Sequence, residues 1–150
     1  MRLPNITKGP ITLSRIDYAA SLSEETVAFS AVIEINGLKG TVSNDGHGGC
    51  NFVHPRSVLD AVVAYAKTLP QWSDFGMTGD ETYDTVIGGM IGRAVDEYEA
   101  QKVRKRMLRK GFKYEAICGH RAYYLKDAPT TPWLNKTFGA DVASVRVSAL

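Results

Sequence analysis

The chain has 150 residues, of which 44% are hydrophobic and 23% charged, so it is long enough to bury one core and has an ordinary globular composition. Its 18 Lys and Arg against 16 Asp and Glu give a net charge of +2, which excludes a strongly basic or acidic tail protein. No apolar run approaches the roughly 18–20 residues of a membrane span, and the N-terminus lacks the apolar stretch of a signal peptide. Two cysteines argue against a disulfide scaffold. We therefore expect a cytoplasmic protein that does not associate with membranes.

The first third of the chain predicts antiparallel β-structure. Residues 26–35 alternate between apolar and polar side chains, and Asn36-Gly37, the strongest short hairpin signal, follows directly. The register that this turn sets places Glu34 opposite Lys39. An earlier strand over 11–18 is expected to pair with this hairpin, with a β-bulge where its alternation slips.

Two helices are expected in the middle of the chain. Pro55 suits the first turn of a helix that runs to about Thr68. The capping-box spacing of Thr78 and Glu81 predicts the start of a longer helix that ends near Lys110. Between the two, residues 71–77 are expected to form a loop, with its aromatic side chains Trp72 and Phe75 against the core.

Three glycines interrupt the longer predicted helix, and each costs about 1 kcal/mol relative to alanine. They are Gly88, Gly89 and Gly92. We expect a closely packed neighbour at this segment, and a homodimer is one way to supply it.

The last part of the chain predicts a second hairpin, over 113–118 and 121–126, then a helix over 133–138 and a strand over 142–147. No linker or repeat divides the sequence. The expected fold is a single α+β domain, 1–150, with an antiparallel β-sheet (N-terminal hairpin plus C-terminal strands) packed with two main helices.

The loop that follows the first hairpin is the strongest candidate for a site. Successive amides in a glycine-rich loop can form an anion-binding nest, and the helix that follows adds its partial positive charge. The loop matches neither the P-loop nor the dinucleotide fingerprint, and its glycines are also explained by a tight connection. The predicted ligand-binding residues are Asn44, Asp45, Gly46, His47, Gly48, Gly49, Asn51, His54 and Arg56.

Cysteine and histidine side chains suggest two further chemistries. His47, Cys50 and His54, if joined by Cys118 and His120, would supply zinc ligands, although neither group has a standard finger spacing. Cys50 is also a candidate nucleophile activated by a histidine, without a recognised local signature. We assign no catalytic residue, cofactor or metal, and expect binding rather than catalysis.

A run of cations near the end of the longer predicted helix is the second candidate site. Such a cluster can hold phosphates, although cations also stabilise a helix C-terminus and keep it soluble. The surface for an anionic partner is predicted at Lys102, Arg104, Lys105, Arg106, Arg109 and Lys110.

The order of these features resembles that of small bacteriophage and prophage proteins. The resemblance rests on a strand followed by Asn44-Asp45-Gly46-His47-Gly48-Gly49, an Asn-Asp-Gly-x-Gly-Gly loop, and extends to the basic helix end and the later hairpin. It implies a phage accessory protein in the host cytoplasm, with anti-defence as a common role, and transfers no activity or catalytic residue.

The leading hypothesis is therefore a protein that binds an anionic ligand, a nucleotide or a nucleic acid, without catalysis. Two alternatives stay open at this point. One is an inhibitor that binds a host protein directly, and the other is a zinc- or thiol-dependent enzyme.

Overall fold

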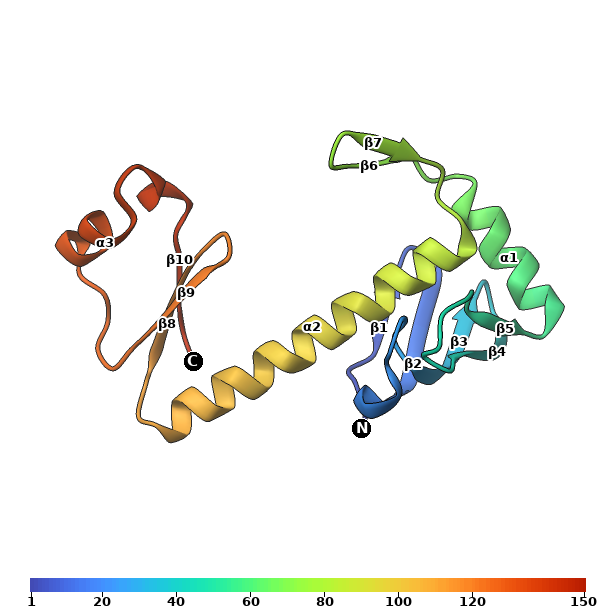
Figure 1. The fold of residues 1–150 in the computed structure, drawn as a ribbon, viewed down its shortest axis with the longest axis horizontal. Coiled ribbons are helices and arrows are strands. Elements are labelled where there is room, and N and C mark those ends of the chain that lie inside the picture. Colours follow the sequence, from blue (N-terminus) through green and yellow to red (C-terminus); the bar gives the residue numbers. More distant parts are fainter. The chain divides into compact units, whose positions relative to one another are not determined.

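A computed structural model describes residues 1–150, which group into two compact units, Met1–Tyr98 and Glu99–Leu150 (Figure 1). Both units combine helices with antiparallel strands, so the α+β class predicted from the sequence is confirmed. The long helix α2 (Tyr83–Arg109) is continuous across the boundary between them. The expectation of one domain over the whole chain stays a prediction.

The first unit is built on a five-stranded antiparallel meander. Its strands are adjacent in sequence order: β1 (Ile6–Lys8), β2 (Ile11–Tyr18), β3 (Phe29–Ile35), β4 (Leu38–Asn44) and β5 (Phe52–His54). Apolar side chains of α1 (Arg56–Ala66) and of the first half of α2 join those of the sheet in one core. A short 3-10 turn, η1 (Ala20–Leu22), follows β2.

The predicted N-terminal hairpin is confirmed residue by residue. Asn36 and Gly37 have φ of 50° and 80°, as a type I′ turn requires. Glu34 lies opposite Lys39, and their charged groups are 3.6 Å apart. The expected bulge in the preceding strand is a register shift between Ser14 and Asp17. Local turn chemistry therefore sets the register between β3 and β4.

Residues 71–77 are not the buried loop that the sequence suggested. They form most of a small hairpin, β6 (Trp72–Asp74) with β7 (Met77–Gly79), and Phe75 at its turn is 92% exposed. Trp72 is exposed as well and packs on Gly79 instead of on the core. The expectation was wrong because two short paired strands can form their backbone hydrogen bonds with each other without burying their aromatic side chains.

The N-terminal cap of helix α2 lies at Thr82, four residues later than the predicted Thr78 cap. Thr82 and Thr85 form a reciprocal cap, in which each backbone N–H donates to the other residue's hydroxyl, at 2.8 and 3.1 Å. The helix ends as expected: Gly111 has a φ of 84°, and the Phe112 amide donates to the Met107 carbonyl at 3.1 Å.

The glycines inside α2 are not explained by close packing, contrary to the expectation. A Cβ built on any of the three would meet no atom within 4 Å, and the helix is unbroken there. The glycines are Gly88, Gly89 and Gly92. Within this chain, therefore, no neighbouring element packs closely against these glycines.

The second unit has its own sheet and its own apolar cluster. Strands β8 (Tyr114–Cys118) and β9 (Arg121–Leu125) form the predicted hairpin, and β10 (Arg146–Ala149) pairs with β8 on its other side. The helix α3 (Thr131–Phe138) and the 3-10 segment η2 (Gly139–Ser144) cover one face. The C-terminal strands thus do not extend the N-terminal sheet, contrary to the expectation of one sheet. The last strand begins at Arg146 and not at residue 142, because η2 occupies residues 139–144.

Candidate functional site

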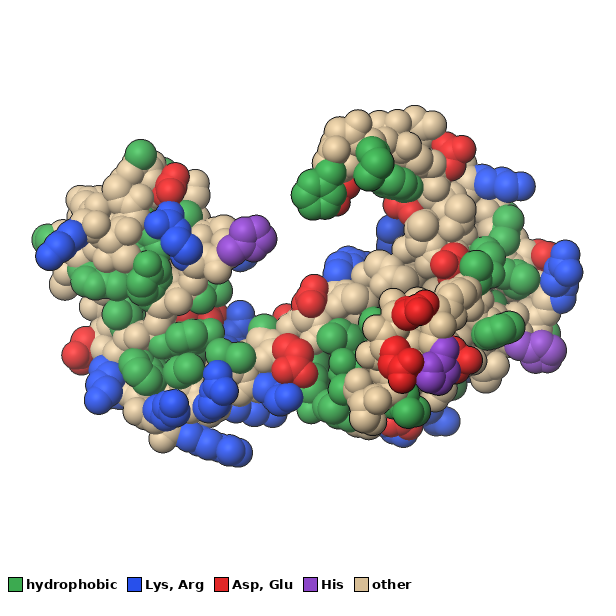
Figure 2. Space-filling model, viewed as in Figure 1, with side chains coloured by type: hydrophobic (Ala, Val, Ile, Leu, Met, Phe, Trp, Pro, Cys, Tyr) green, Lys and Arg blue, Asp and Glu red, His purple; other side chains and the backbone are tan.

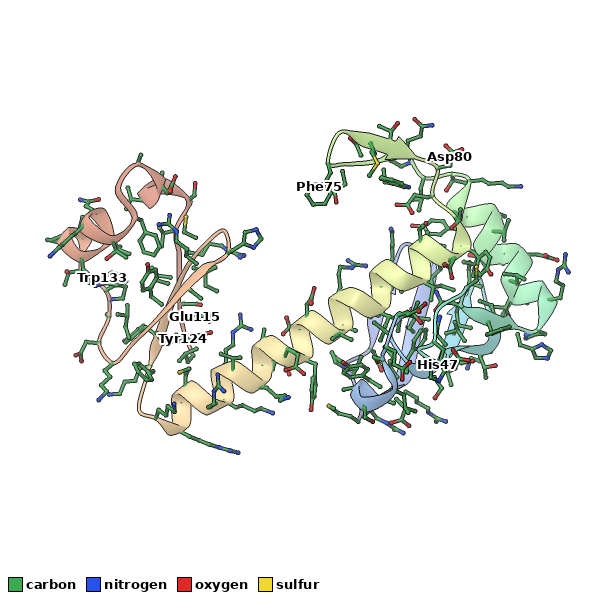
Figure 3. The ribbon with its side chains drawn as sticks, viewed as in Figure 1. His47, Phe75, Asp80, Glu115, Tyr124 and Trp133 are labelled. Atoms are coloured by element: carbon green, nitrogen blue, oxygen red, sulfur yellow. The ribbon has the colours of Figure 1, made fainter.

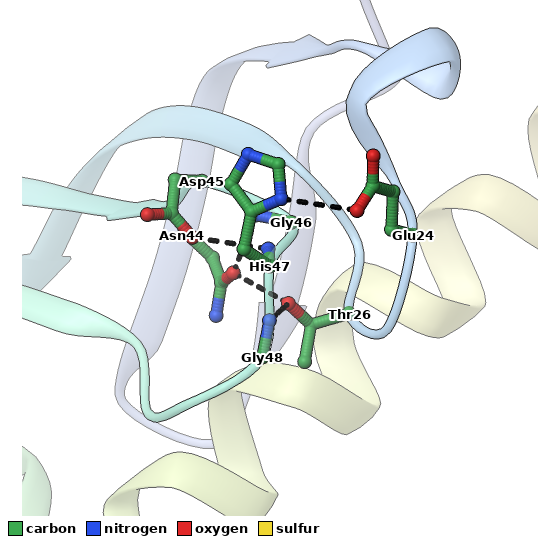
Figure 4. A network of polar contacts seen from close by, with 7 residues as sticks. All are labelled: Glu24, Thr26, Asn44, Asp45, Gly46, His47 and Gly48. Atoms are coloured by element: carbon green, nitrogen blue, oxygen red, sulfur yellow. Dashed lines mark hydrogen bonds and ion pairs between the residues drawn. The ribbon is translucent and has the colours of Figure 1, made fainter.

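The glycine loop between β4 and β5 is organised around one buried side chain. Asn44 is 7% exposed, and its Oδ1 accepts hydrogen bonds from the Thr26 hydroxyl at 2.7 Å and from the Gly46 amide at 2.9 Å (Figure 4). Its amide nitrogen donates to Asn51 Oδ1 at 3.3 Å. The Gly46 carbonyl accepts from three successive amides, those of Glu24, Glu25 and Thr26. The loop is therefore fastened to the turn that precedes β3.

Four of the amides expected to form an anion nest are used by the protein itself. The Gly46 amide donates to Asn44, the His47 amide to Asp45 at 3.1 Å, and the Gly48 amide to Thr26 at 3.3 Å (Figure 4). The amide of Asn51 donates to the Asp84 carboxylate at 2.6 Å. The expectation that the amides of this loop face outward and bind an anion is therefore wrong for these four residues, because side-chain oxygens of the protein accept their hydrogen bonds.

The far end of the loop is tied to the start of α2. The Asn51 side chain, 8% exposed, also donates to Asp84 Oδ1 at 2.8 Å. Burial raises the pKa of the neighbouring Tyr83 hydroxyl, and the charges of Cys50 and Asp84 and a hydrogen bond with the Cys50 thiol add to the rise. These contacts hold the loop against the helix rather than opening it to a ligand.

Three of the predicted ligand residues line a cavity together with residues from outside the loop. This cavity has a volume of about 480 Å³ and is walled by the ends of β2, β3 and β4 and by η1. Asn44, Asp45 and His47 contribute to it; His47 is labelled in Figure 3. His47 Nδ1 lies 3.2 Å from Glu24 Oε2 (Figure 4).

The other predicted ligand residues do not line this cavity. Gly46 is buried, and Gly48, Gly49 and Asn51 lie in the remainder of the loop. His54 is exposed in β5, and the Arg56 guanidinium pairs with Asp60 at 3.0 Å on the surface of α1. The structure therefore does not bring the nine residues together at one site.

Cysteine chemistry has little support in the geometry. Cys50 is exposed and Cys118 is buried, and both are free thiols. No group of three or more His, Cys, Asp or Glu side chains is arranged to hold a metal ion, as the zinc alternative requires.

None of the helices combines the length and apolar character of a membrane-spanning segment.

The cationic surface of α2 is resolved into two parts. Four of the six predicted residues line one surface groove of about 400 Å³ together with Glu99 and Val103: Lys102, Lys105, Arg106 and Arg109. Their spacing of i, i+3, i+4 and i+7 places them on one face of the helix. Arg104 lies on a different face, where its guanidinium is 3.0 Å from the carboxylate of Glu115, and Lys110 is exposed beyond the groove.

The two units differ sharply in charge, which the total of +2 conceals. The unit Met1–Tyr98 has 7 Lys and Arg against 12 Asp and Glu, a net charge of −5, whereas Glu99–Leu150 has 11 against 4, a net charge of +7. Blue side chains accordingly gather along the end of α2 in the space-filling view (Figure 2). A charge count that took the last third of the sequence separately would have revealed this asymmetry, which sequence reasoning missed.

Comparison with protein-family models, with curated proteins and with solved structures finds no match to this chain.

Proposed function

We propose that the protein binds nucleic acid through its phosphate backbone, using the groove on α2 formed by Lys102, Lys105, Arg106 and Arg109. The observation that carries this proposal is the alignment of these four cations on one helical face. Lys105, Arg106 and Arg109 make no ion pair within the protein, so their charges are not already neutralised. Cations on one face of a helix can contact successive phosphates of one backbone.

The charge of the second unit supports a polyanionic partner. A net charge of +7 within 52 residues creates a local positive potential, while 12 of the 16 acidic residues belong to the other unit. At physiological salt, charges separated by more than about 8 Å of solvent are largely screened, so the local charge matters more than the total. The overall value of +2 is therefore a poor guide to affinity.

The groove favours a polymer over a free nucleotide. It is open and lies along one helix, where the first and last cations are separated by about 10 Å of helix rise. A free nucleotide needs an enclosed site with directed donors, whereas a backbone supplies several phosphates in a row. Because phosphate contacts carry no sequence information, we expect binding that is independent of sequence and steeply dependent on salt.

The test is fluorescence anisotropy of the full chain with a labelled 20-base-pair duplex and with a single strand of the same length, across a salt series. With up to four phosphate contacts, the slope of log K against log salt should lie between about −2 and −4 for the duplex. The double variant Arg106→Glu/Arg109→Glu should weaken binding at least tenfold and flatten this slope.

The matched control reverses two exposed cations of the first unit that form no ion pair, Lys67→Glu/Arg93→Glu, and keeps the same change in net charge. This control should weaken binding less than threefold. Equal losses in both double variants would contradict the proposal. Absence of binding by the wild-type chain would leave the host-protein alternative as the stronger hypothesis. The relation to phage proteins remains a prediction.

A further inference from the structure

The cavity beside the glycine loop, described above, is the second binding feature of the molecule, and it lies wholly within the first unit. Its volume of about 480 Å³ falls in the range of small-molecule sites. Apolar walls come from Tyr18, Ala19, Leu22, Ala28 and Phe29. Phe29 begins β3 and Ala28 directly precedes it, and both side chains are buried, so this wall is preformed.

Charged groups at this cavity are acidic or already neutralised. No Lys or Arg side chain lines it. Asp17 is compensated by the Met1 amino group at 3.6 Å and by Arg2 at 3.8 Å. His47 is held by Glu24.

Asp45 is the remaining carboxylate, and it forms no ion pair. Its Oδ1 accepts the His47 amide, which fixes the carboxylate at the rim (Figure 4). A bound ligand with a positive charge would neutralise it, and an anion would be repelled.

We infer that this cavity binds a small ligand with an aromatic or aliphatic body and a protonated amine, the body lying on Tyr18, Leu22 and Phe29 and the amine facing Asp45. The preferred ligand is thus a cation, whereas the glycine loop suggested an anion. The inference does not depend on nucleic-acid binding, because the groove on α2 belongs to the other unit.

Two probes of matched shape test this inference: tryptamine, a cation, and indole-3-propionate, an anion. In calorimetry with the full chain at neutral pH, tryptamine should bind saturably and at least threefold more tightly than indole-3-propionate. Asp45→Asn keeps an oxygen for the His47 amide but removes the charge, so it should weaken tryptamine binding about two- to fivefold, the range of an exposed charge pair. Asp74→Asn removes an exposed carboxylate elsewhere in the unit and should leave binding unchanged.

A blocking variant tests the location. Ser30 is exposed, lies in β3 and lines the cavity, so Ser30→Phe should fill the cavity with a residue that strands accept, and abolish binding of both probes. Thr41→Phe, at an exposed position of β4 outside the cavity, is the matched control.

Three results would overturn the inference: no binding of tryptamine, equal binding of the two probes, or binding that survives Ser30→Phe. If Ser30→Phe fails to fold, the comparison of Asp45→Asn with Asp74→Asn still decides.

Discussion

Arg104 holds the buried carboxylate of Glu115 through two nitrogens of its guanidinium, Nε and Nη2, each 3.0 Å from Oε1. The Glu115 side chain is 5% exposed, and the Ser148 hydroxyl donates to the same oxygen at 3.2 Å. This arrangement joins the end of α2 to the strands β8 and β10. It also explains why Arg104, although part of the cationic run, does not face the groove.

Removing Arg104 should therefore destabilise the second unit. Arg104→Ala leaves a buried carboxylate without its cation, and we expect a loss of about 3 kcal/mol in the free energy of unfolding. Urea denaturation measures this loss, and hydrogen exchange should locate it in β8 and β10. Arg106→Ala, on the exposed groove face, should change stability by less than about 0.5 kcal/mol. If Arg104→Ala lowers the free energy of unfolding no more than Arg106→Ala does, the contact between Arg104 and Glu115 adds no stability.

The glycine loop should tolerate a methyl group at one glycine and not at another. Gly46 has a φ of 90°, and a Cβ there would collide with the Leu22 carbonyl and with Ala28. Gly46→Ala should cost about 3 kcal/mol or more, from left-handed strain together with this overlap. Gly49 has a φ of 85° and open space around it, so Gly49→Ala should cost about 1–2 kcal/mol from strain alone. Thermal unfolding of the two variants gives the comparison, and a larger loss at Gly49 would refute it.

Alanine inside α2 should stabilise the chain. Gly88 and Gly89 are exposed, and a Cβ at either position meets nothing within 4 Å. Each replacement by alanine should add about 0.5–1 kcal/mol, because it reduces the backbone entropy lost on helix formation. Chemical denaturation with parallel sedimentation analysis is the measurement. A loss of stability accompanied by dissociation of a dimer would instead mean that a second copy packs on these glycines.

The turn of the β6–β7 hairpin carries a strained residue. Phe75 has a φ of 49°, a conformation that is unfavourable for a bulky side chain, and Gly76 follows with a φ of 76°. Phe75→Asn creates the Asn-Gly pair preferred in type I′ turns, and should raise stability by up to about 1 kcal/mol. Hydrogen exchange of β6 and β7 should slow in this variant. Faster exchange would imply that the Phe75 side chain stabilises the hairpin.

Alkaline pH should weaken the contact between the loop and α2. The pKa of Tyr83 is raised in the folded chain, so the unfolded chain loses this proton first as the pH rises. The contribution of the protonated Tyr83 hydroxyl to the free energy of unfolding is fully present below the ordinary tyrosine pKa of about 10. It is lost as the pH rises through the pKa that Tyr83 has in the folded chain. Denaturation at a series of pH values around and above 10 should show a smaller decline for Tyr83→Phe than for the wild type. An identical decline would exclude a contribution from Tyr83.

The amino-acid sequence by itself determined the elements that depend on neighbouring residues. The turn at Asn36-Gly37, the helix end at Gly111 and the hairpin around Gly119 were all predictable, because turn chemistry and side-chain periodicity act over a few positions. The cations on α2 were predictable for the same reason, since helical spacing alone places four of them on one face.

Only the tertiary structure decided how the amides of the glycine loop are used and where one unit ends and the next begins. The Asn51 amide is taken by Asp84, 33 positions away, and the Gly48 amide by Thr26, 22 positions away, so no local pattern reveals that these donors are used. The uneven charge can be counted along the sequence, but only the fold places the boundary between the units of −5 and +7 after Tyr98, within a continuous helix. Long-range hydrogen-bond partners and the boundary between compact units are properties of the folded chain.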